Sequence, residues 1–224
     1  MKILLNGSIY FFDLIDKLVH QKKIISFFKK IKIKIKKLID VGSHKGLYTD
    51  LFLQNYKIKK IIMFEPQVKI FNYLKKKYFK NKKIKIYNYA VSNKNTFQNL
   101  QLNHHDLTTT LSKFNDDNFY LKIKALLFGV EKMTYQKIKI KTIKLNNIFQ
   151  KDRIFKVDLL KIYTEGHELE VLEGLKKKIS IIKYILIEFH YDKIYVKYNP
   201  KKIHNYLLKN NFTLEAKFKF PFTT

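Results

Sequence analysis

Short apolar runs alternate with segments of helical periodicity along the first half of the chain. The runs at 36–41, 60–64 and 84–89 have the length and composition of buried strands. The segments 48–52 and 68–78 between them carry apolar residues at helical spacing. This alternation predicts strand–helix units that form a parallel sheet with crossover helices, with ligands at the carboxyl ends of the strands.

The second half of the chain resumes this pattern after a less regular stretch. Residues 93–133 are polar and mixed, and they are expected to form an irregular insertion or a lid over the site. Apolar runs at 138–143, 158–162 and 183–189 predict further strands of the main pattern, and residues 165–177 predict a helix. The predicted fold class is therefore α/β, with a central, mostly parallel sheet flanked by helices.

The two ends of the chain add less regular elements to this pattern. Residues 9–28 carry apolar positions at mixed three- and four-residue spacing, which predicts an amphipathic leading helix. A further helix is expected from Pro200, and a strand pair around 212–218. No repeat or linker rich in Gly, Pro or Ser interrupts the chain, so we expect an N-terminal helical extension over 1–35 and one domain over 36–224.

The charge of the chain is strongly positive, with 46 Lys+Arg against 18 Asp+Glu and a net charge of +28. Such an excess favours a polyanionic partner or an anionic membrane surface. Lysine, however, alternates with isoleucine in 29–40 and 136–145, which places lysines on the solvated face of a strand. A solvated lysine surface is therefore the preferred interpretation, and a nucleic-acid partner stays possible without being favoured.

Cysteine usage and the first residues bear on the compartment. The chain has no cysteine, which excludes disulfides, thiolate metal sites and cysteine nucleophiles. The apolar start is interrupted by Asn6, Gly7, Asp13 and Asp16, and no uncharged apolar stretch of about 18 residues occurs. These features predict a cytoplasmic protein without a transmembrane segment.

The clearest local motif is LIDVGSHKGLYT, residues 38–49, in which an apolar strand runs into a glycine loop and a helix. Glycines such as Gly42 and Gly46 allow a ligand to approach the backbone, and the helix N-terminus offers free amide donors. The next strand ends in Glu65, 19 residues (65 − 46) after Gly46. That spacing is typical of an acid that binds ribose hydroxyls in dinucleotide-binding folds.

Several motifs together resemble the FkbM family of S-adenosylmethionine (SAM)-dependent methyltransferases. The most specific is DLLKIYTEGHELEVLEG, residues 158–174, which resembles the signature of that family. The others occur in family order: DVGSHKGLYT (40–49), MFEP (63–66), NYAVS (88–92), TIKLNNIF (142–149) and IEFH (187–190). The resemblance covers about residues 38 to 190 and implies a Rossmann-like class I methyltransferase fold.

The resemblance also implies a cofactor, a reaction and a cofactor site. The expected reaction is O-methylation of a small-molecule or sugar/glycan-type acceptor, with SAM as cofactor. The resemblance assigns the methionine part of SAM to the glycine motif, its ribose to Glu65 and its adenine to the third-strand motif. The expected cofactor-binding residues are Asp40, Gly42, Ser43, Gly46, Tyr48, Glu65, Asn88 and Ala90.

The chain departs from the family pattern at two positions. Tyr163 stands where the pattern has an acid after Lys-Ile, and Asn146 stands where an aspartate usually follows leucine. Both changes remove a carboxylate. A SAM-binding protein with impaired catalysis is therefore one alternative function.

The catalytic candidates lie near the ends of two strands. Because a methyl transfer needs a group that takes up the acceptor proton, we name Glu165, His167 and Lys161 as candidate catalytic residues, with Glu168, Glu188 and His190 nearby in sequence. His167 has an ordinary pKa suited to this role, although Glu165, His167 and Glu168 also suit a plain first helical turn. Lys161 is expected either to contact substrate or to be buried and paired, for example with Glu188 or Glu165.

Four further interpretations concern the function of the chain and two of its segments. A nucleic-acid methyltransferase is the alternative prompted by charge, but Asn199-Pro200 is followed by Lys201 and not by the Pro-aromatic pair common in base-amino methyltransferases. A dehydrogenase would need nicotinamide in place of SAM. His104, His105 and Asp106 are adjacent, which makes joint ligation awkward, so no metal site is expected. The segment 108–112 resembles a substrate-proximal family segment, with a plain loop as the alternative.

Overall fold

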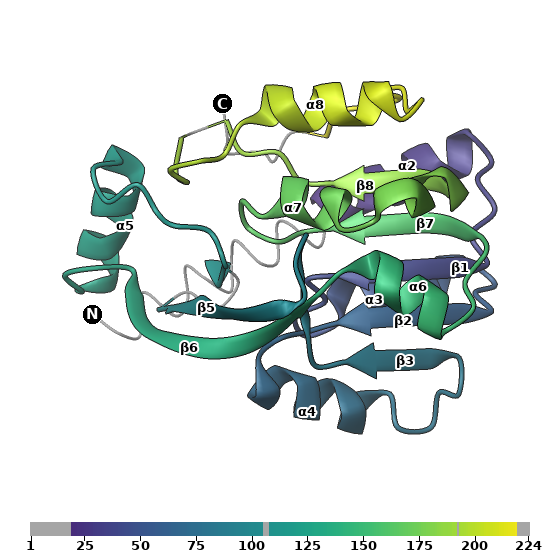
Figure 1. Ribbon diagram of the computed structural model, residues 1–224, viewed down its shortest axis with the longest axis horizontal. Coiled ribbons are helices and arrows are strands. Elements are labelled where there is room, and N and C mark those ends of the chain that lie inside the picture. Colours follow the sequence, from purple (N-terminus) through teal and green to yellow (C-terminus); the bar gives the residue numbers. More distant parts are fainter. Residues whose placement is uncertain (1–18, 105–107, 192, 219–224) are drawn as a thin grey trace. The chain divides into compact units, whose positions relative to one another are not determined.

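The structure, a computed structural model, describes residues 19–104, 108–191 and 193–218 (Figure 1). Contacts divide the chain into two compact units. One is Ile35–Asn211, and the described residues of the other are 19–34 and 212–218. No sequence pattern predicts that residues 19–34 and 212–218 belong to one unit.

The smaller unit contains helix α2 (Gln21–Lys30), which overlaps the predicted leading helix; residues 9–18 of that prediction lie outside the described residues. The Phe27 ring meets the Phe218 ring edge-on at 5.5 Å. Residues 212–218 form no strand, so the predicted strand pair is wrong. Their alternation of apolar and polar side chains is compatible with extended backbone, but no strand of the described chain pairs with them.

In the described part of the larger unit, five parallel strands form the main sheet in the order β3-β2-β1-β7-β8. These strands are β1 (Lys37–Val41), β2 (Lys60–Phe64), β3 (Ile84–Tyr87), β7 (Val157–Ile162) and β8 (Ile182–Ile187). The central strands are almost wholly buried because helices cover both faces. This arrangement confirms the predicted α/β fold with a parallel central sheet.

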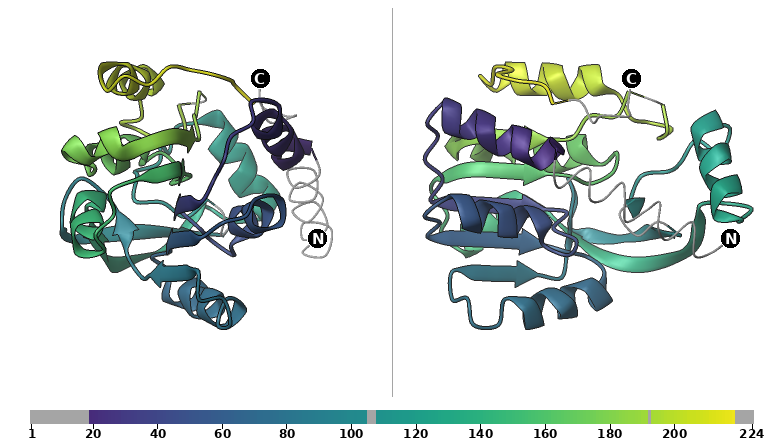
Figure 2. Two further views of the ribbon diagram at one scale, coloured as in Figure 1. Left: turned by 90° about the vertical axis from the view of Figure 1, so that its right-hand side faces the viewer. Right: turned by 180° about the vertical axis from the view of Figure 1, so that it is seen from behind.

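Helices cover the two faces of this sheet (Figures 1 and 2). One face carries α3 (Leu47–Asn55) and α4 (Val68–Lys77). The other carries α6 (Leu145–Lys151) and α7 (Glu168–Glu173), followed by a 3₁₀ helix at Lys176–Ile181. Helix α8 (Pro200–Lys209) begins at Asn199, whose side chain accepts a hydrogen bond from Lys202 N, and it contacts α7 through Tyr206.

A second sheet lies beyond the carboxyl ends of the main strands (Figure 1). It has the order β4-β6-β5 and consists of β4 (Ala90–Val91), β5 (Thr96–Asn103) and β6 (Thr134–Ile143). Strand β6 is antiparallel to β5 and parallel to β4. Helix α5 (Phe119–Phe128) lies between β5 and β6 in sequence.

This second sheet corrects two predictions. The run at 138–143 does not belong to the main sheet, and the stretch 93–133 is not irregular throughout, since it holds β5 and α5. The pattern of β6 explains the difference: lysine alternates with apolar residues along it, which suits a strand with one solvent-exposed face, whereas the central parallel strands β1 and β7 are almost wholly buried. Residues 31–36, with the same alternation, form a turn and irregular backbone.

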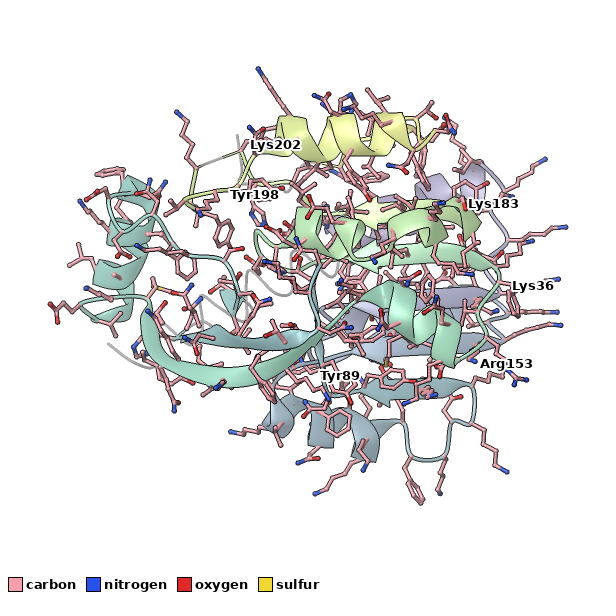
Figure 3. All side chains as sticks on the ribbon, viewed as in Figure 1. Lys36, Tyr89, Arg153, Lys183, Tyr198 and Lys202 are labelled. Atoms are coloured by element: carbon pink, nitrogen blue, oxygen red, sulfur yellow. The ribbon has the colours of Figure 1, made fainter. Side chains whose placement is uncertain are left out.

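Many of the basic side chains point outward. Figure 3 shows Lys36, Arg153 and Lys183 projecting from the amino-end side of the main sheet, opposite Tyr89. In the part of the chain that the structure describes, no helix is both long and apolar enough to cross a bilayer.

Candidate active site

A cleft opens at the carboxyl ends of the main strands, and its space of about 590 Å³ includes open solvent. Its walls come from the glycine loop, the end of β2, the start of β4, the loop 109–111 and the loop 163–167. Of the eleven predicted catalytic and cofactor-binding residues, five line it: Gly42, Glu65, Ala90, Glu165 and His167. The other six are not among the lining residues: Asp40, Ser43, Gly46, Tyr48, Asn88 and Lys161.

Gly42 brings the ends of β1 and β7 close together. Its φ is +72°, and a Cβ at this position would lie 1.8 Å from the carbonyl oxygen of Tyr163. Only glycine fits such a close approach of two backbones. Gly46, with φ +80°, begins α3, and the Tyr78 hydroxyl occupies the place where its side chain would be. Ser43 stabilises the loop by donating its hydroxyl to Asp40 O at 2.8 Å.

Asp40 and Lys161 form a buried ion pair beneath this loop. The strand register sets them side by side on β1 and β7, and Lys161 Nζ lies 3.0 Å from Asp40 Oδ1. The same Nζ donates to Gly42 O at 2.6 Å, and Thr49 donates its hydroxyl to Asp40 Oδ2 at 2.8 Å. Lys161 is therefore buried and paired, with Asp40 and not with the suggested Glu188 or Glu165.

Two tyrosines complete the environment of Lys161. The Tyr48 hydroxyl donates to the Tyr163 hydroxyl at 3.1 Å, and their rings meet edge-on at 4.9 Å. Lys161 Nζ lies 4.7 Å from the centre of the Tyr163 ring, a distance at which the ring attracts the cation. Where the family pattern has a carboxylate, this chain thus has an aromatic face beside Lys161. Asn146, the other departure, does not line the cleft; its backbone N–H donates to Gly174 O.

Glu65 is the acid at the end of β2, and it is 3% exposed. Its Oε2 accepts from His44 N at 3.0 Å and its Oε1 from Gln67 N at 2.8 Å. Burial raises the pKa of Glu65 to about 7, although the two backbone donors oppose that rise. Asn88 fixes the turn after β2 by donating to Glu65 O and Pro66 O, both at 2.9 Å.

The loop after β7 carries Glu165 in a conformation rare for a side chain with a Cβ. Its φ is +55°, and Gly166 follows with φ +88°. Thr110 donates its hydroxyl to Glu165 O at 2.5 Å, and Ser112 donates to Gly166 O at 2.7 Å. The segment 108–112 therefore packs on this loop, and its residues 109–111 line the cleft.

His167 lies in the cleft wall and is 7% exposed. Its Nε2 is 2.9 Å from Ser92 Oγ, and its Nδ1 is 3.6 Å from Glu170 Oε2. Burial lowers the pKa of His167 to about 4, so the imidazole is neutral at physiological pH. A base of such low pKa, with both nitrogens near polar partners, takes up a proton less readily than an ordinary histidine.

Glu168 begins α7 and is fully buried. Its Oε1 accepts from Thr164 N and the Thr164 hydroxyl, both at 2.9 Å, and from Gly166 N at 3.3 Å. Burial raises the pKa of this carboxyl to about 7. Glu168 therefore holds the loop after β7, and it is not among the residues that line the cleft.

Beside Glu165 lie Glu188 and His190, which follow the adjacent strand β8. Each of these three residues offers one atom that could bind a metal ion, and these three atoms lie within 4.8 Å of one another. Burial, and next the charge of Glu188, raises the pKa of Glu165 to about 7. Burial alone would lower the pKa of His190. The nearby carboxylates, above all Glu188, outweigh this effect and raise the pKa of His190 to about 10. Tyr195 donates its hydroxyl to Glu165 Oε2 at 2.6 Å.

Sequence reasoning missed other parts of the site. His44 and Tyr89 line the cleft, and Tyr195 holds Glu165 from a segment after β8. No local sequence signal marks Tyr195, because its role depends on a contact across 30 residues. His104 packs against the Tyr135 ring at 5.1 Å, while His105 and Asp106 lie outside the described residues.

Comparison with known proteins agrees with this architecture. Among solved structures, the chain is similar to the methyltransferase FkbM from Methylobacillus flagellatus KT, with a TM-score of 0.51 and 15% sequence identity. The match covers 78% of this chain and 37% of that longer one, and it concerns the fold alone. No curated protein sequence matches the chain significantly. Residues 40–214 match the methyltransferase FkbM domain, and the chain belongs to this methyltransferase family.

Proposed function

We propose that this protein transfers the methyl group of SAM to a hydroxyl oxygen of a small-molecule or sugar-type acceptor, in the cytoplasm. The single observation that carries the proposal is the position of Glu65, a buried carboxylate at the end of β2 in the wall of the cleft. Membership of the methyltransferase family supplies the reaction class. The choice of cofactor and acceptor oxygen is the proposed part.

The chemistry of the cleft suits an adenosine-containing cofactor. A carboxylate can accept about four hydrogen bonds, so Glu65 keeps capacity for a ribose diol beyond its two backbone donors. Apolar side chains of Phe64, Val91 and Leu100 line the same cleft and offer a surface for a flat base.

Bound SAM would supply an activated methyl group on a sulfonium, so the protein has to align the acceptor and accept its proton. Glu165 is the better candidate for the proton, because it lines the cleft and its pKa is about 7. His167 has a pKa of about 4, which makes it a weaker base. Lys161 acts through Asp40 and the glycine loop, so its proposed role is to position that loop.

The deciding experiment is a calorimetric titration of the purified protein with S-adenosylhomocysteine. Wild type should bind one equivalent, and Glu65→Ala should bind at least about tenfold more weakly, since it loses charged hydrogen bonds to the ribose. Glu131→Ala is the matched control, because Glu131 is exposed and does not line the cleft. Absence of binding by correctly folded wild type would refute the cofactor assignment.

A SAM-binding protein with impaired turnover is the second candidate function, and Tyr163 is the observation that favours it. Its ring, not a carboxylate, faces Lys161. Radiolabelled methyl transfer to a panel of hydroxyl acceptors would separate the two functions, with wild type and Tyr163→Asp compared. Turnover by wild type supports the enzyme, whereas turnover only by Tyr163→Asp supports the impaired protein. If neither turns over while both bind S-adenosylhomocysteine, the lost carboxylate does not explain inactivity.

A further inference from the structure

The cluster of Glu165, Glu188 and His190 has the composition of a metal site. It offers two carboxylates and one imidazole, and their ligand atoms lie within 4.8 Å of one another. Two ligand atoms of a tetrahedral zinc lie about 3.4 Å apart when each bond is about 2.1 Å. The distance of 3.6 Å between His190 Nε2 and Glu188 Oε2 is close to that separation.

Two tyrosines of the segment after β8 hold all three residues in place. Tyr195 donates to Glu165 Oε2, and its ring packs edge-on against His190 at 5.1 Å. Tyr198 accepts from His190 N at 3.1 Å and donates to Glu188 O at 3.4 Å. Figure 3 shows Tyr198 on the chain between β8 and α8. Such outer contacts orient ligands in metal sites.

The absence of a side chain at Gly166 makes this support possible. A Cβ on Gly166 would lie 2.5 Å from the Tyr195 ring, so the ring packs directly on the backbone of the loop that carries Glu165. The same loop holds Glu165 at a φ of +55°. The local backbone is thus built to present the Glu165 carboxylate next to His190.

Glu168 provides an independent indication of a bound cation. It is fully buried, and its Oε2 has no hydrogen-bond partner in the described part of the chain. The charged groups that act on it most strongly are His190 and Glu188. Neither Glu165 nor Glu168 forms an ion pair with a lysine or arginine of the described residues, although the chain has 46 of them. A buried carboxylate oxygen without a partner is costly unless something else satisfies it.

From this geometry we infer that Glu165, Glu188 and His190 bind one first-row divalent transition-metal ion, such as zinc or manganese, at the wall of the cleft. The imidazole favours zinc over calcium and magnesium, which prefer oxygen alone, and the two carboxylates are ligands that manganese also accepts. Glu168 adds negative charge behind the ligands. Three protein ligands leave a coordination position for an oxygen of water or of a bound molecule. Since Glu165 lines the cleft, the ion would lie beside the acceptor, and Glu165 would serve as the proton acceptor of the proposed function only in the ion-free protein.

The test is metal titration of the full chain after treatment with a chelator and dialysis. Calorimetry with zinc and manganese chlorides should show one ion per chain, and zinc should displace manganese. Glu188→Gln and His190→Gln should each weaken binding at least about tenfold, because each removes a ligand. His204→Gln is the matched control, since His204 is exposed on α8. Circular dichroism checks that each variant is folded.

A measurement on the wild type keeps the test decisive if the variants do not fold. Pulsed electron paramagnetic resonance of the manganese-bound protein should show coupling to one histidine nitrogen. No stoichiometric ion, no nitrogen coupling, or unchanged affinity in folded His190→Gln would overturn the inference. Titration with S-adenosylhomocysteine in excess chelator separates this result from the proposed function. Binding of S-adenosylhomocysteine without any metal binding would leave the methyltransferase proposal standing and remove the metal site alone.

Discussion

Two groups of buried or half-buried charges lie near the carboxyl ends of the main sheet, and they are balanced differently. At the end of β1, Asp40 is paired with Lys161 at 3.0 Å, and Thr49 satisfies its second oxygen. At the ends of β7 and β8, Glu165, Glu168 and Glu188 surround one histidine. The first group pairs its two charges with each other, and the second, counted over the described residues, carries more negative than positive charge.

The difference separates a structural role from a binding role. A buried ion pair with both partners satisfied fixes the glycine loop and does not need a ligand. Carboxylates that crowd together are costly in a buried place, and such arrangements are typical of sites that bind a cation or handle a proton. Charge removal should therefore destabilise the first group and stabilise the second.

The largest effect is expected for Lys161→Met, which breaks the complete pair. Asp40 would remain buried without its cation, and the free energy of unfolding should fall by about 3–5 kcal/mol. Denaturant unfolding followed by circular dichroism measures this loss. The double variant Asp40→Asn/Lys161→Met should recover part of it, because no buried charge is left. A loss below about 1 kcal/mol in the single variant would contradict a structural role.

Glu168→Gln should increase the free energy of unfolding when metal is removed with a chelator. The pKa of Glu168 is about 7 in the fold against 4.5 ordinarily, so the folded state binds more protons between these values. Wild-type stability is therefore lost as pH rises from 4.5 to 7, and the variant avoids that loss. Its advantage should be absent near pH 4.5 and reach about 3 kcal/mol at pH 8.

Thermal and denaturant unfolding at both pH values measure this advantage of Glu168→Gln. Glu173→Gln, an exposed position on the same helix, is the control and should change stability by no more than about 0.5 kcal/mol. If Glu168→Gln is less stable than wild type at pH 8, other groups of the folded protein compensate the charge of the Glu168 carboxylate. The contrast between the two charge groups would then fail.

Glu65 belongs to neither charge group, and Glu65→Gln tests its role in cofactor binding. Because the pKa of Glu65 is about 7, the proportion of carboxylate rises between pH 6 and pH 8. Wild-type affinity for S-adenosylhomocysteine should rise over the same range, since a charged acceptor binds ribose hydroxyls more strongly. The variant should bind about tenfold more weakly at pH 8 and show little pH dependence. Calorimetry at three pH values measures both; equal pH profiles would contradict the role of Glu65.

The smallest effect is expected for Tyr163→Phe, which keeps the ring beside Lys161 and removes the hydrogen bond with Tyr48. Stability should fall by about 1 kcal/mol, the usual contribution of one such bond. Denaturant unfolding measures it, and Tyr135→Phe, at an exposed tyrosine, is the control. A loss as large as that of Lys161→Met would show that the hydroxyl, and not the ring, supports the ion pair.

Much of the fold could be predicted because its signals are local. The apolar run at 60–64 and the glycine loop after β1 each lie in a short segment whose pattern is unambiguous. The strand at 138–143 was assigned to the wrong sheet because periodicity identifies a strand but not its neighbours. Its lysine alternation, which indicates a half-exposed strand, was the signal that could have prevented the error.

The site was harder to predict because it depends on pairing across the chain. The partner of Lys161 follows from the adjacency of β1 and β7, which no single segment encodes. Glu165 and His190 could be named, since both follow strands, but their approach required the order of the strands. Tyr195 had no signal, because a tyrosine in a polar segment is ordinary until its partner is known.

The burial of Lys161 has a practical consequence for chemical labelling. The chain has 46 Lys+Arg, and many lysines are exposed, whereas Lys161 is 2% exposed and lies against Asp40. Acylating reagents should modify the exposed amines quickly and leave Lys161 unmodified while the glycine loop keeps its place. Mass spectrometry of the peptide that contains Lys161 would then report local opening of the loop. The extent of modification of the exposed lysines serves as the internal reference.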